Sequence, residues 1–365
     1  MHVEVFSIIS FISAAIRLPD GSYSSQLRRI KSTGNDLGRL ERFNALSRKI
    51  CATCPDLDEF DRELREAKKS RIYSTPLMCL ASGLATGGFA VFFGGKWNDG
   101  LIAFLIGFLM KVIDVKMPSR VNVMAKTVVS AAFAAAVALL MARVGIADSA
   151  DYVIIGAIMV LVPGVSFGTA MRDLLYGDLL AGTLKTLQAF LLALMIAFGY
   201  IISAELLSLV GIPIEVTAMI SDFETFFKPI FFIASLGAVL GSVSFAILFN
   251  IAPRHLLCGT VCGLLTFLVY YTVEFFTGGM VFPAAFVSTM FTALYAEITS
   301  RVRKAPTIVF LIPGVIPTVP GGALYRAMRA LLLLDYVVHR LDDGVARSVG
   351  ARRADLQPSR LPVVC

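Results

Sequence analysis

Nine apolar segments follow one another along the chain, and this succession constrains the fold more than any other feature. They lie near 76–95, 99–113, 123–144, 152–171, 179–204, 229–252, 255–276, 279–297 and 306–325, and a tenth lies around 327–339. Most are long enough for a helix to cross a hydrocarbon layer about 30 Å thick. In lipid the backbone must satisfy its own hydrogen bonds, so helices are expected. The sequence therefore predicts an all-α polytopic membrane protein with nine or ten transmembrane helices.

The composition also indicates that lipid surrounds most of the chain. Its 365 residues are 57% hydrophobic and 16% charged, whereas soluble domains average about 45–50% apolar and about 25% charged residues. A formal net charge of +7 would suggest nucleic acid in a soluble protein. Here we interpret the basic residues as topology signals that face anionic lipid. We expect membrane lipid, and no nucleic acid, among the partners.

The stretch before the first apolar segment, residues 1–71, is predicted to be a small cytoplasmic α+β region. Residues 3–16 are rich in β-branched side chains and precede the turn sequence LPDGS, which favours a strand over a signal peptide. We expect no cleaved signal. Residues 17–71 contain 13 Lys/Arg and 9 Asp/Glu. Within them, 56–71 has acids before bases, as in a solvated helix.

The distribution of lysine and arginine predicts that this N-terminal region is cytoplasmic. With that orientation, the loops on the inner side carry most of the bases: Lys111, Lys116, Arg120, Lys126, Arg254, Arg301, Arg303 and Lys304. The outer loops carry mainly acids. An excess of bases on the inner side is the usual determinant of orientation. We expect a multi-pass protein of the inner (plasma) membrane.

One short phrase occurs twice, as LVPGV at 161–165 and LIPGV at 311–315. Each copy lies in the fourth span of its half, if the halves are 72–210 and 223–340, followed by a basic tail at 341–365. Five spans per half would place the second copy in the opposite sense, so the sequence predicts two five-helix inverted repeats. Proline removes an amide donor, and the adjacent glycine lets another backbone approach. Matched interruptions point to a transport site, although two ordinary kinks are the alternative.

Residues 164–168 also read G-x-S-x-G, the pattern around a hydrolase nucleophile. Such a serine needs a strand before it and a histidine partner, whereas Ser166 follows a run long enough for a membrane helix. His255 is the histidine that could meet it, as in an intramembrane protease. Ile316 occupies the serine position in the second copy, so the repeat preserves backbone features and not the hydroxyl. We expect Ser166 to donate a hydrogen bond to substrate or to a freed carbonyl.

Charged residues near the two phrases are further candidates for function, because ionisable groups inside a membrane are costly. Arg172, Asp173 and Asp178 follow the first phrase, and Arg326 follows the second. An arginine can hold a substrate carboxylate, and a carboxylate can carry a coupling proton. A local ion pair between Arg172 and Asp173 is the alternative. Lys185 and Glu297 are expected to extend from helix ends into water.

The stretch LVPGVSFGTAMRDLLYGDLLAG (161–182) resembles the motif of the threonine/serine exporter family, and FLIPGVIPTVPGGALYRAM (310–328) resembles its companion module. The segment WNDGLIAFLIGF (97–108) is also similar to the second span of that family. The resemblance covers about 3–330 and implies two modules fused in one chain, in a bacterial inner membrane. The last family helix is long and apolar, whereas here an arginine-rich tail follows, so the C-terminus is predicted to be altered or truncated.

The resemblance implies a secondary transporter that exports threonine or serine, and not an enzyme. We expect proton coupling by antiport, since the chain has no G-x-x-x-x-G-K-[ST] phosphate loop. A dicarboxylate such as succinate is the alternative substrate, and an intramembrane serine hydrolase is the alternative function. We predict no cofactor and no metal, and a homo-oligomer is left open. The predicted substrate-binding residues are Pro163, Gly164, Ser166, Arg172, Asp173, Asp178, Pro313, Gly314, Pro317, Pro320, Gly321, Tyr325 and Arg326.

Overall fold

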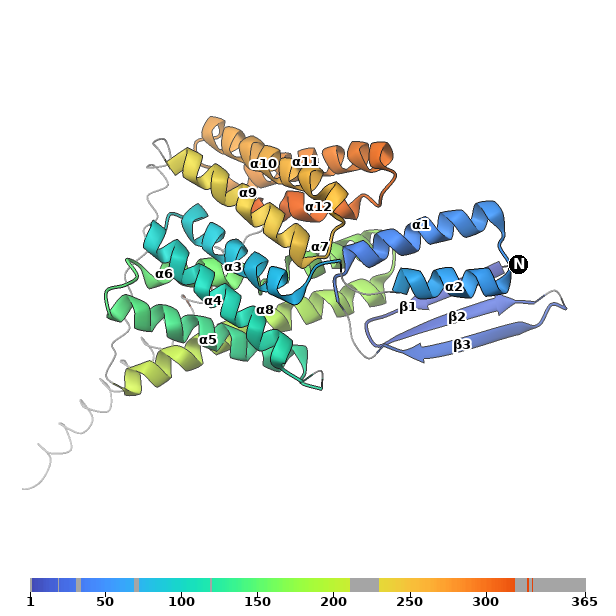
Figure 1. The fold of residues 1–365 in the computed structure, drawn as a ribbon, viewed down its shortest axis with the longest axis horizontal. Coiled ribbons are helices and arrows are strands. Elements are labelled where there is room, and N and C mark those ends of the chain that lie inside the picture. Colours follow the sequence, from blue (N-terminus) through green and yellow to red (C-terminus); the bar gives the residue numbers. More distant parts are fainter. Residues whose placement is uncertain are drawn as a thin grey trace, which may run out of the picture. The chain divides into compact units, whose positions relative to one another are not determined.

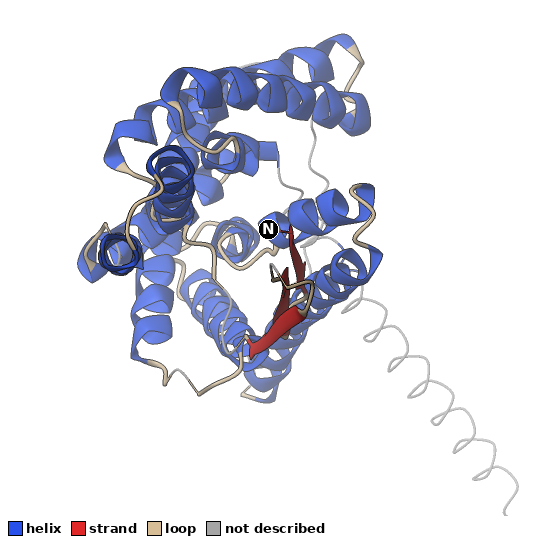
Figure 2. Ribbon diagram, turned by 90° about the vertical axis from the view of Figure 1, so that its right-hand side faces the viewer, coloured by secondary structure: helices blue, strands red, loops and turns tan. Residues whose placement is uncertain are grey.

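The computed structural model describes residues 2–318, with gaps at 19, 31–33, 69–71, 119 and 211–229, together with Ala327 and Ala330. The part from 2 to 318 belongs to one compact unit that ends at Gly321. Helices make up most of it, and the strands are confined to the N-terminus (Figures 1 and 2). Six of the described helices are long and apolar enough to cross a membrane, and a bent pair raises the number to seven. The predicted multi-pass helical fold is confirmed at this level.

The N-terminal region is an antiparallel three-stranded sheet followed by two helices. Its elements are β1 (His2–Ser7), β2 (Phe11–Arg17), β3 (Tyr23–Arg29), α1 (Leu37–Thr53) and α2 (Leu57–Lys68). The strand predicted over 3–16 is thus two strands, and the charged sequence gave no sign of β3. The predicted turn LPDGS joins β2 to β3: Gly21 has a φ of 84°, and the carboxylate of Asp20 accepts from Ser22 N at 2.9 Å.

Six helices follow, and the pair α6 and α7 is bent. They are α3 (Thr75–Phe92), α4 (Trp97–Lys116), α5 (Val123–Arg143), α6 (Ala150–Met159) with α7 (Gly164–Leu175), and α8 (Leu179–Leu209). After the gap come α9 (Ile230–Leu248), α10 (Pro253–Phe276), α11 (Val281–Arg303), α12 (Ile308–Val315) and the 3-10 turn η2 (Ile316–Thr318). Nine of the predicted segments coincide with these helices or their described part, and the tenth, around 327–339, lies outside the described residues apart from Ala327 and Ala330.

Helix α4 is longer than the predicted segment 99–113, which ended where charges begin. The Nζ atom of Lys111 lies 2.9 Å from Asp114 Oδ2, one turn along the same helix, and Lys126 of α5 is 3.5 Å from the other carboxylate oxygen. This pairing lets the helix continue to Lys116. At its other end, the fully buried Asp99 accepts from the amides of Asp148 (2.9 Å) and Ser149 (3.1 Å), and so fixes the start of α4 to the start of α6.

Glycines bring the helices close together, as their spacing predicts. A Cβ atom added at Gly83 or Gly87 of α3 would lie 2.8 Å or 2.7 Å from a carbonyl oxygen of α4. One added at Gly237 of α9 would lie 2.8 Å from the carbonyl oxygen of Gly88, and one at Gly241 would lie 2.7 Å from the ring of Phe89. Helix α3 therefore packs closely against both α4 and α9.

The N-terminal region is bound to the turn between α9 and α10. Asn250, in the left-handed conformation with φ 59°, donates from Nδ2 to Asp36 Oδ1 at 2.8 Å and accepts from Ile72 N at 2.8 Å. The hydroxyl of Tyr73 donates to Ile251 O, also at 2.8 Å. A Cβ atom at Gly38 would lie only 2.1 Å from Asn250 O, so glycine is needed at this contact. The sequence contained no signal for this interface.

Candidate functional site: the two Pro-Gly segments

The first Pro-Gly segment interrupts a membrane-spanning helix, as predicted. Helix α6 ends at Met159, α7 begins at Gly164, and their axes differ by 47°. Pro163 is buried and caps α7 without a side-chain hydrogen bond. Among the described residues, no acceptor faces the amides of Val165 and Ser166. These groups lie at the positive end of the α7 dipole, which suits a carboxylate.

The second Pro-Gly segment differs from the prediction, because α12 runs through Pro313 without a break. The amide of Ile316 donates to Ile312 O at the end of α12, and the chain then tightens into the 3-10 turn that contains Pro317. A proline inside a helix removes one hydrogen bond and crowds the preceding turn. In α12 the close packing of Pro313 and Gly314 on neighbouring helices holds the helical path.

That packing is unusually close on α10. A Cβ atom at Gly259 would lie 3.0 Å from the Pro313 ring, and one at Gly263 would lie 3.1 Å from Pro313 O. One at Gly314 would lie 2.5 Å from Cys262 Sγ and 2.7 Å from the methyl group of Thr292 on α11. Pro313, Gly314 and Pro317 are all buried. The second segment is therefore enclosed by α10 and α11 in this structure.

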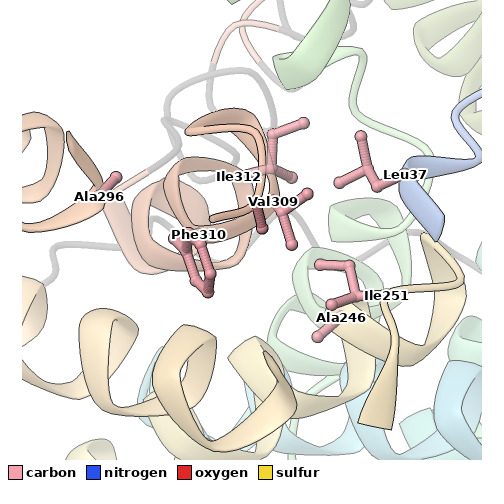
Figure 3. Close-up of a cluster of buried hydrophobic side chains, with 8 residues drawn as sticks. Leu37, Ala246, Ile251, Ala296, Val309, Phe310 and Ile312 are labelled. Atoms are coloured by element: carbon pink, nitrogen blue, oxygen red, sulfur yellow. The ribbon is translucent and has the colours of Figure 1, made fainter. Parts of the chain in front are cut away.

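Two buried clusters connect the segments. In the first, Val165 of α7 packs against a core that includes Val309, Phe310 and Ile312 of α12. Figure 3 shows Val309 and Ile312 on the side of α12 that faces Leu37 of α1, with Phe310 on another side. In the second cluster, Met159 and Val160 at the end of α6 share a core with Ile316 of η2. The chain thus brings the two copies of the phrase into one neighbourhood.

The charged residues after the first segment form an ion-pair group. Asp173 is 9% exposed, its Oδ1 lies 3.6 Å from Arg172 NH2, and its Oδ2 contacts the Nζ atom of Lys185 on α8. Lys185 was expected to extend into water, and its contact with Asp173 replaces that interpretation. Asp178 is exposed at the start of α8, and its backbone amide donates to the carbonyl oxygen of Asp173 at 2.9 Å. The local pairing considered for Arg172 and Asp173 is present, with a partner that sequence analysis missed.

Of the remaining predicted residues, one is partly buried and the others lie outside the described part of the chain. Ser166 is partly buried in the first turn of α7. Its suggested partner His255 is 2% exposed and is engaged elsewhere, since its Nε2 lies 3.0 Å from Glu41 Oε1 and 3.1 Å from Arg254 Nε. Four residues of the second motif, Pro320, Gly321, Tyr325 and Arg326, lie outside the described residues.

Residues 1–207 match the family described as "Putative threonine/serine exporter", and residues 234–348 match the one described as "Threonine/Serine exporter, ThrE". The chain belongs to the threonine/serine exporter family. The first match ends within α8, and the second begins within α9. Membership supports a transporter and a small-molecule substrate.

A curated relative of this exporter-family chain is described as "Probable threonine/serine exporter" of Mycobacterium tuberculosis (strain ATCC 25618 / H37Rv). It is 24% identical over 340 residues, which cover 90% of this chain. The chain spans 63% of the length of that relative. No solved structure matches the chain.

Proposed function

We propose that this exporter-family chain carries threonine or serine out of the bacterial cytoplasm across the inner membrane, by proton antiport. The observation that carries the proposal is the bend at Pro163, where the first amides of α7 have no acceptor among the described residues and Val165 packs against the helix of the second Pro-Gly segment. A transported amino acid has a carboxylate for such amides and an ammonium group for backbone carbonyls. Each copy of the phrase lies in a part of the chain that matches a threonine/serine exporter model.

The proposed binding site lies between the two segments. Gly164 and Ser166 would hold the carboxylate at the start of α7, and Pro163, Pro313, Gly314 and Pro317 would form the walls. Arg172 and Asp173 would lie at one exit, with Asp178 further along the chain. Pro320, Gly321, Tyr325 and Arg326 complete the proposal from the undescribed part of the second motif.

Equivalent contacts in the two halves support an inverted repeat. Thr86, Phe89 and Gly107 precede Ser242, Phe245 and Gly263 by the same number of residues. A Cβ atom at Gly107 would lie 2.1 Å from Thr86 Oγ1, and one at Gly263 would lie 1.9 Å from Ser242 Oγ. The two members of the remaining pair contact each other: the rings of Phe89 and Phe245 pack edge to face, with their centroids 6.0 Å apart. Contact between equivalent residues is expected near a two-fold axis.

Transport of radiolabelled threonine, serine and succinate by inverted membrane vesicles tests the proposal. We expect threonine or serine to accumulate when the vesicle lumen is acidic, and little succinate. Gly314→Ala should abolish accumulation, since its Cβ atom would lie 2.5 Å from Cys262 Sγ. Gly168→Ala is the matched control, because nothing lies within 4 Å of a Cβ atom there.

Three results would contradict the proposal. Uptake of succinate alone would assign a dicarboxylate substrate. Equal uptake by wild type and Gly314→Ala protein, at equal abundance, would remove the second segment from the site. Labelling of Ser166 by a fluorophosphonate, with no transport of any of the three solutes, would favour a hydrolase.

A further inference from the structure

Helix α10 carries a buried carboxyl group that the proposed site does not use. Glu274 lies near the end of α10 opposite to Arg254, and it is 7% exposed. Its Oε1 atom is buried and has no hydrogen-bond partner in the part of the chain that the structure describes. The side chain shares a hydrogen bond with Tyr270, one turn earlier. Burial of a carboxylate ion without a cation costs far more free energy than burial of the neutral carboxylic acid.

Glu274 is on the packed face of α10 rather than on its lipid face. The residues at helical spacing before it, Phe267 and Tyr271, pack against α9: Phe267 shares a core with Ala234, and the ring of Tyr271 lies 5.0 Å from that of Phe231. Side chains three, four and seven positions apart lie along one side of a helix. Glu274 therefore continues the face of α10 that α9 covers.

No basic side chain offsets a charge on Glu274 among the described residues. Helices α9 and α12 and the turn η2, which pack against α10, contain no charged residue, and the charges of α11 are at its other end, from Glu297 to Arg303. The other ionisable groups of α10 are Arg254, His255, two cysteines and two tyrosines. Four charged residues before α9, namely Glu215, Asp222, Glu224 and Lys228, lie outside the described residues.

The same face of α10 leads to the second Pro-Gly segment. Its buried residues include Gly259, Cys262, Gly263 and Thr266. The first three contact Pro313 or Gly314, and Thr266 Oγ1 lies 2.7 Å from Thr292 Oγ1. From Gly263 to Glu274 the rise is about 16 Å along the axis. A movement at the Glu274 end of α10 is therefore transmitted along one rigid helix to the proposed substrate site.

We propose that Glu274 is the proton-binding group that links transport to the proton gradient, an inference that rests on the proposed export function. With the orientation proposed above, a proton from water on the outer side binds to a carboxylate oxygen and gives the neutral acid. The neutral acid can be enclosed between α9 and α10, as it is here. In an antiport cycle this proton is then released to the cytoplasmic side, and the ionised form that remains must regain water, so ionisation favours separation of the outer ends of these helices.

Glu274→Gln tests this role, since glutamine has the size of the protonated acid and cannot ionise. In inverted vesicles with radiolabelled threonine, we expect exchange at equal pH to be retained within about twofold of wild type. Accumulation driven by an acidic lumen should fall at least tenfold, and the dependence of exchange on lumenal pH should become flat. Glu274→Asp should retain part of the response to the pH gradient. Glu297→Gln, at an exposed glutamate of α11, is the matched control and should behave like wild type.

Two outcomes would overturn the inference. One is full accumulation by the Glu274→Gln protein in response to the pH gradient. The other is loss of exchange in both Glu274 variants at normal abundance, which would assign the residue to structure rather than coupling. Failure of the export function itself is distinguishable, because the wild-type protein would then exchange no threonine.

Discussion

The Nε2 atom of His255 lies 3.0 Å from Glu41 Oε1, although the two residues are 214 positions apart in the sequence. Both side chains are buried, and the same carboxylate oxygen also contacts Arg254 NH2. The ring of His255 packs edge to face on Phe310, at 5.3 Å between centroids. One carboxylate of α1 thus holds the start of α10 next to the helix that contains Pro313.

Glu41→Ala should destabilise the protein by about 2–4 kcal/mol, because it leaves the buried His255 and one side of Arg254 without their partner. We expect a lower midpoint of thermal unfolding in detergent. It can be measured by light scattering, or as the amount of protein that still elutes in its size-exclusion peak after heating. Glu66→Ala removes an exposed glutamate from α2 and serves as control. Equal midpoints for the two variants would mean that the Glu41 contacts contribute nothing.

Asp99→Ala should destabilise the protein more than removal of the neighbouring acid Asp148. Asp99 accepts from three backbone amides, those of Lys96, Asp148 and Ser149, and its removal should cost about 2–4 kcal/mol. Asp148→Ala breaks the ion pair with the largely exposed Lys96 and a long hydrogen bond from Asn98 (3.5 Å), so its effect should be much smaller. Membrane abundance and thermal survival of the two variants give the comparison, and a larger effect at Asp148 would contradict it.

Gly263→Ala should impair folding or transport, because its Cβ atom would lie 1.9 Å from Ser242 Oγ and 2.7 Å from Ser242 Cβ. The second change Ser242→Gly removes both atoms and should restore activity in the double variant. Measured survival of the four proteins forms a double-mutant cycle whose coupling should exceed about 1 kcal/mol. Additive effects would show that the two positions do not compete for the same space.

Tyr73 should make the bond between the N-terminal region and the α9–α10 turn sensitive to alkali. Burial raises the pKa of this phenol, which donates to Ile251 O. The folded protein therefore retains the proton longer than the unfolded chain, so this stabilisation is complete below about pH 10 and is lost as the pH rises further. The Tyr73→Phe protein should be less stable than wild type at neutral pH. Its thermal stability should also fall less than that of wild type between about pH 9 and 11. The exposed Tyr23→Phe should follow wild type across the same thermal series.

Reporter fusions should give opposite signals in two loops. If the N-terminal region is cytoplasmic, a reporter inserted within 117–122 should give a cytoplasmic signal. A reporter inserted within 211–224 should give the signal of the outer side. Basic residues flank the first loop, and acids dominate the second. A cytoplasmic signal from the second loop would contradict the proposed orientation.

The helices could be predicted from sequence because each apolar run carries its own signal. The bend at Pro163 was also local, since one proline follows directly on an apolar helix. Pro313 shows the limit of this reasoning: the same residues remain helical where Gly259 and Gly263 of another helix enclose them. The contacts of Asp173 with Lys185 and of Glu41 with His255 join separate helices, so no spacing in the chain could reveal them.

The bonds around Asn250 have a consequence for the order of biosynthesis. Ile72 is translated 178 residues before the side chain to which its amide donates. The helices of the first half are therefore made before α1 has its partner at the α9–α10 turn. Only when the α9–α10 turn returns to the same side of the membrane can the N-terminal region complete its contacts. A nascent chain arrested before that point would expose the region to proteases and chaperones, so docking at Asn250 marks the arrival of the second half.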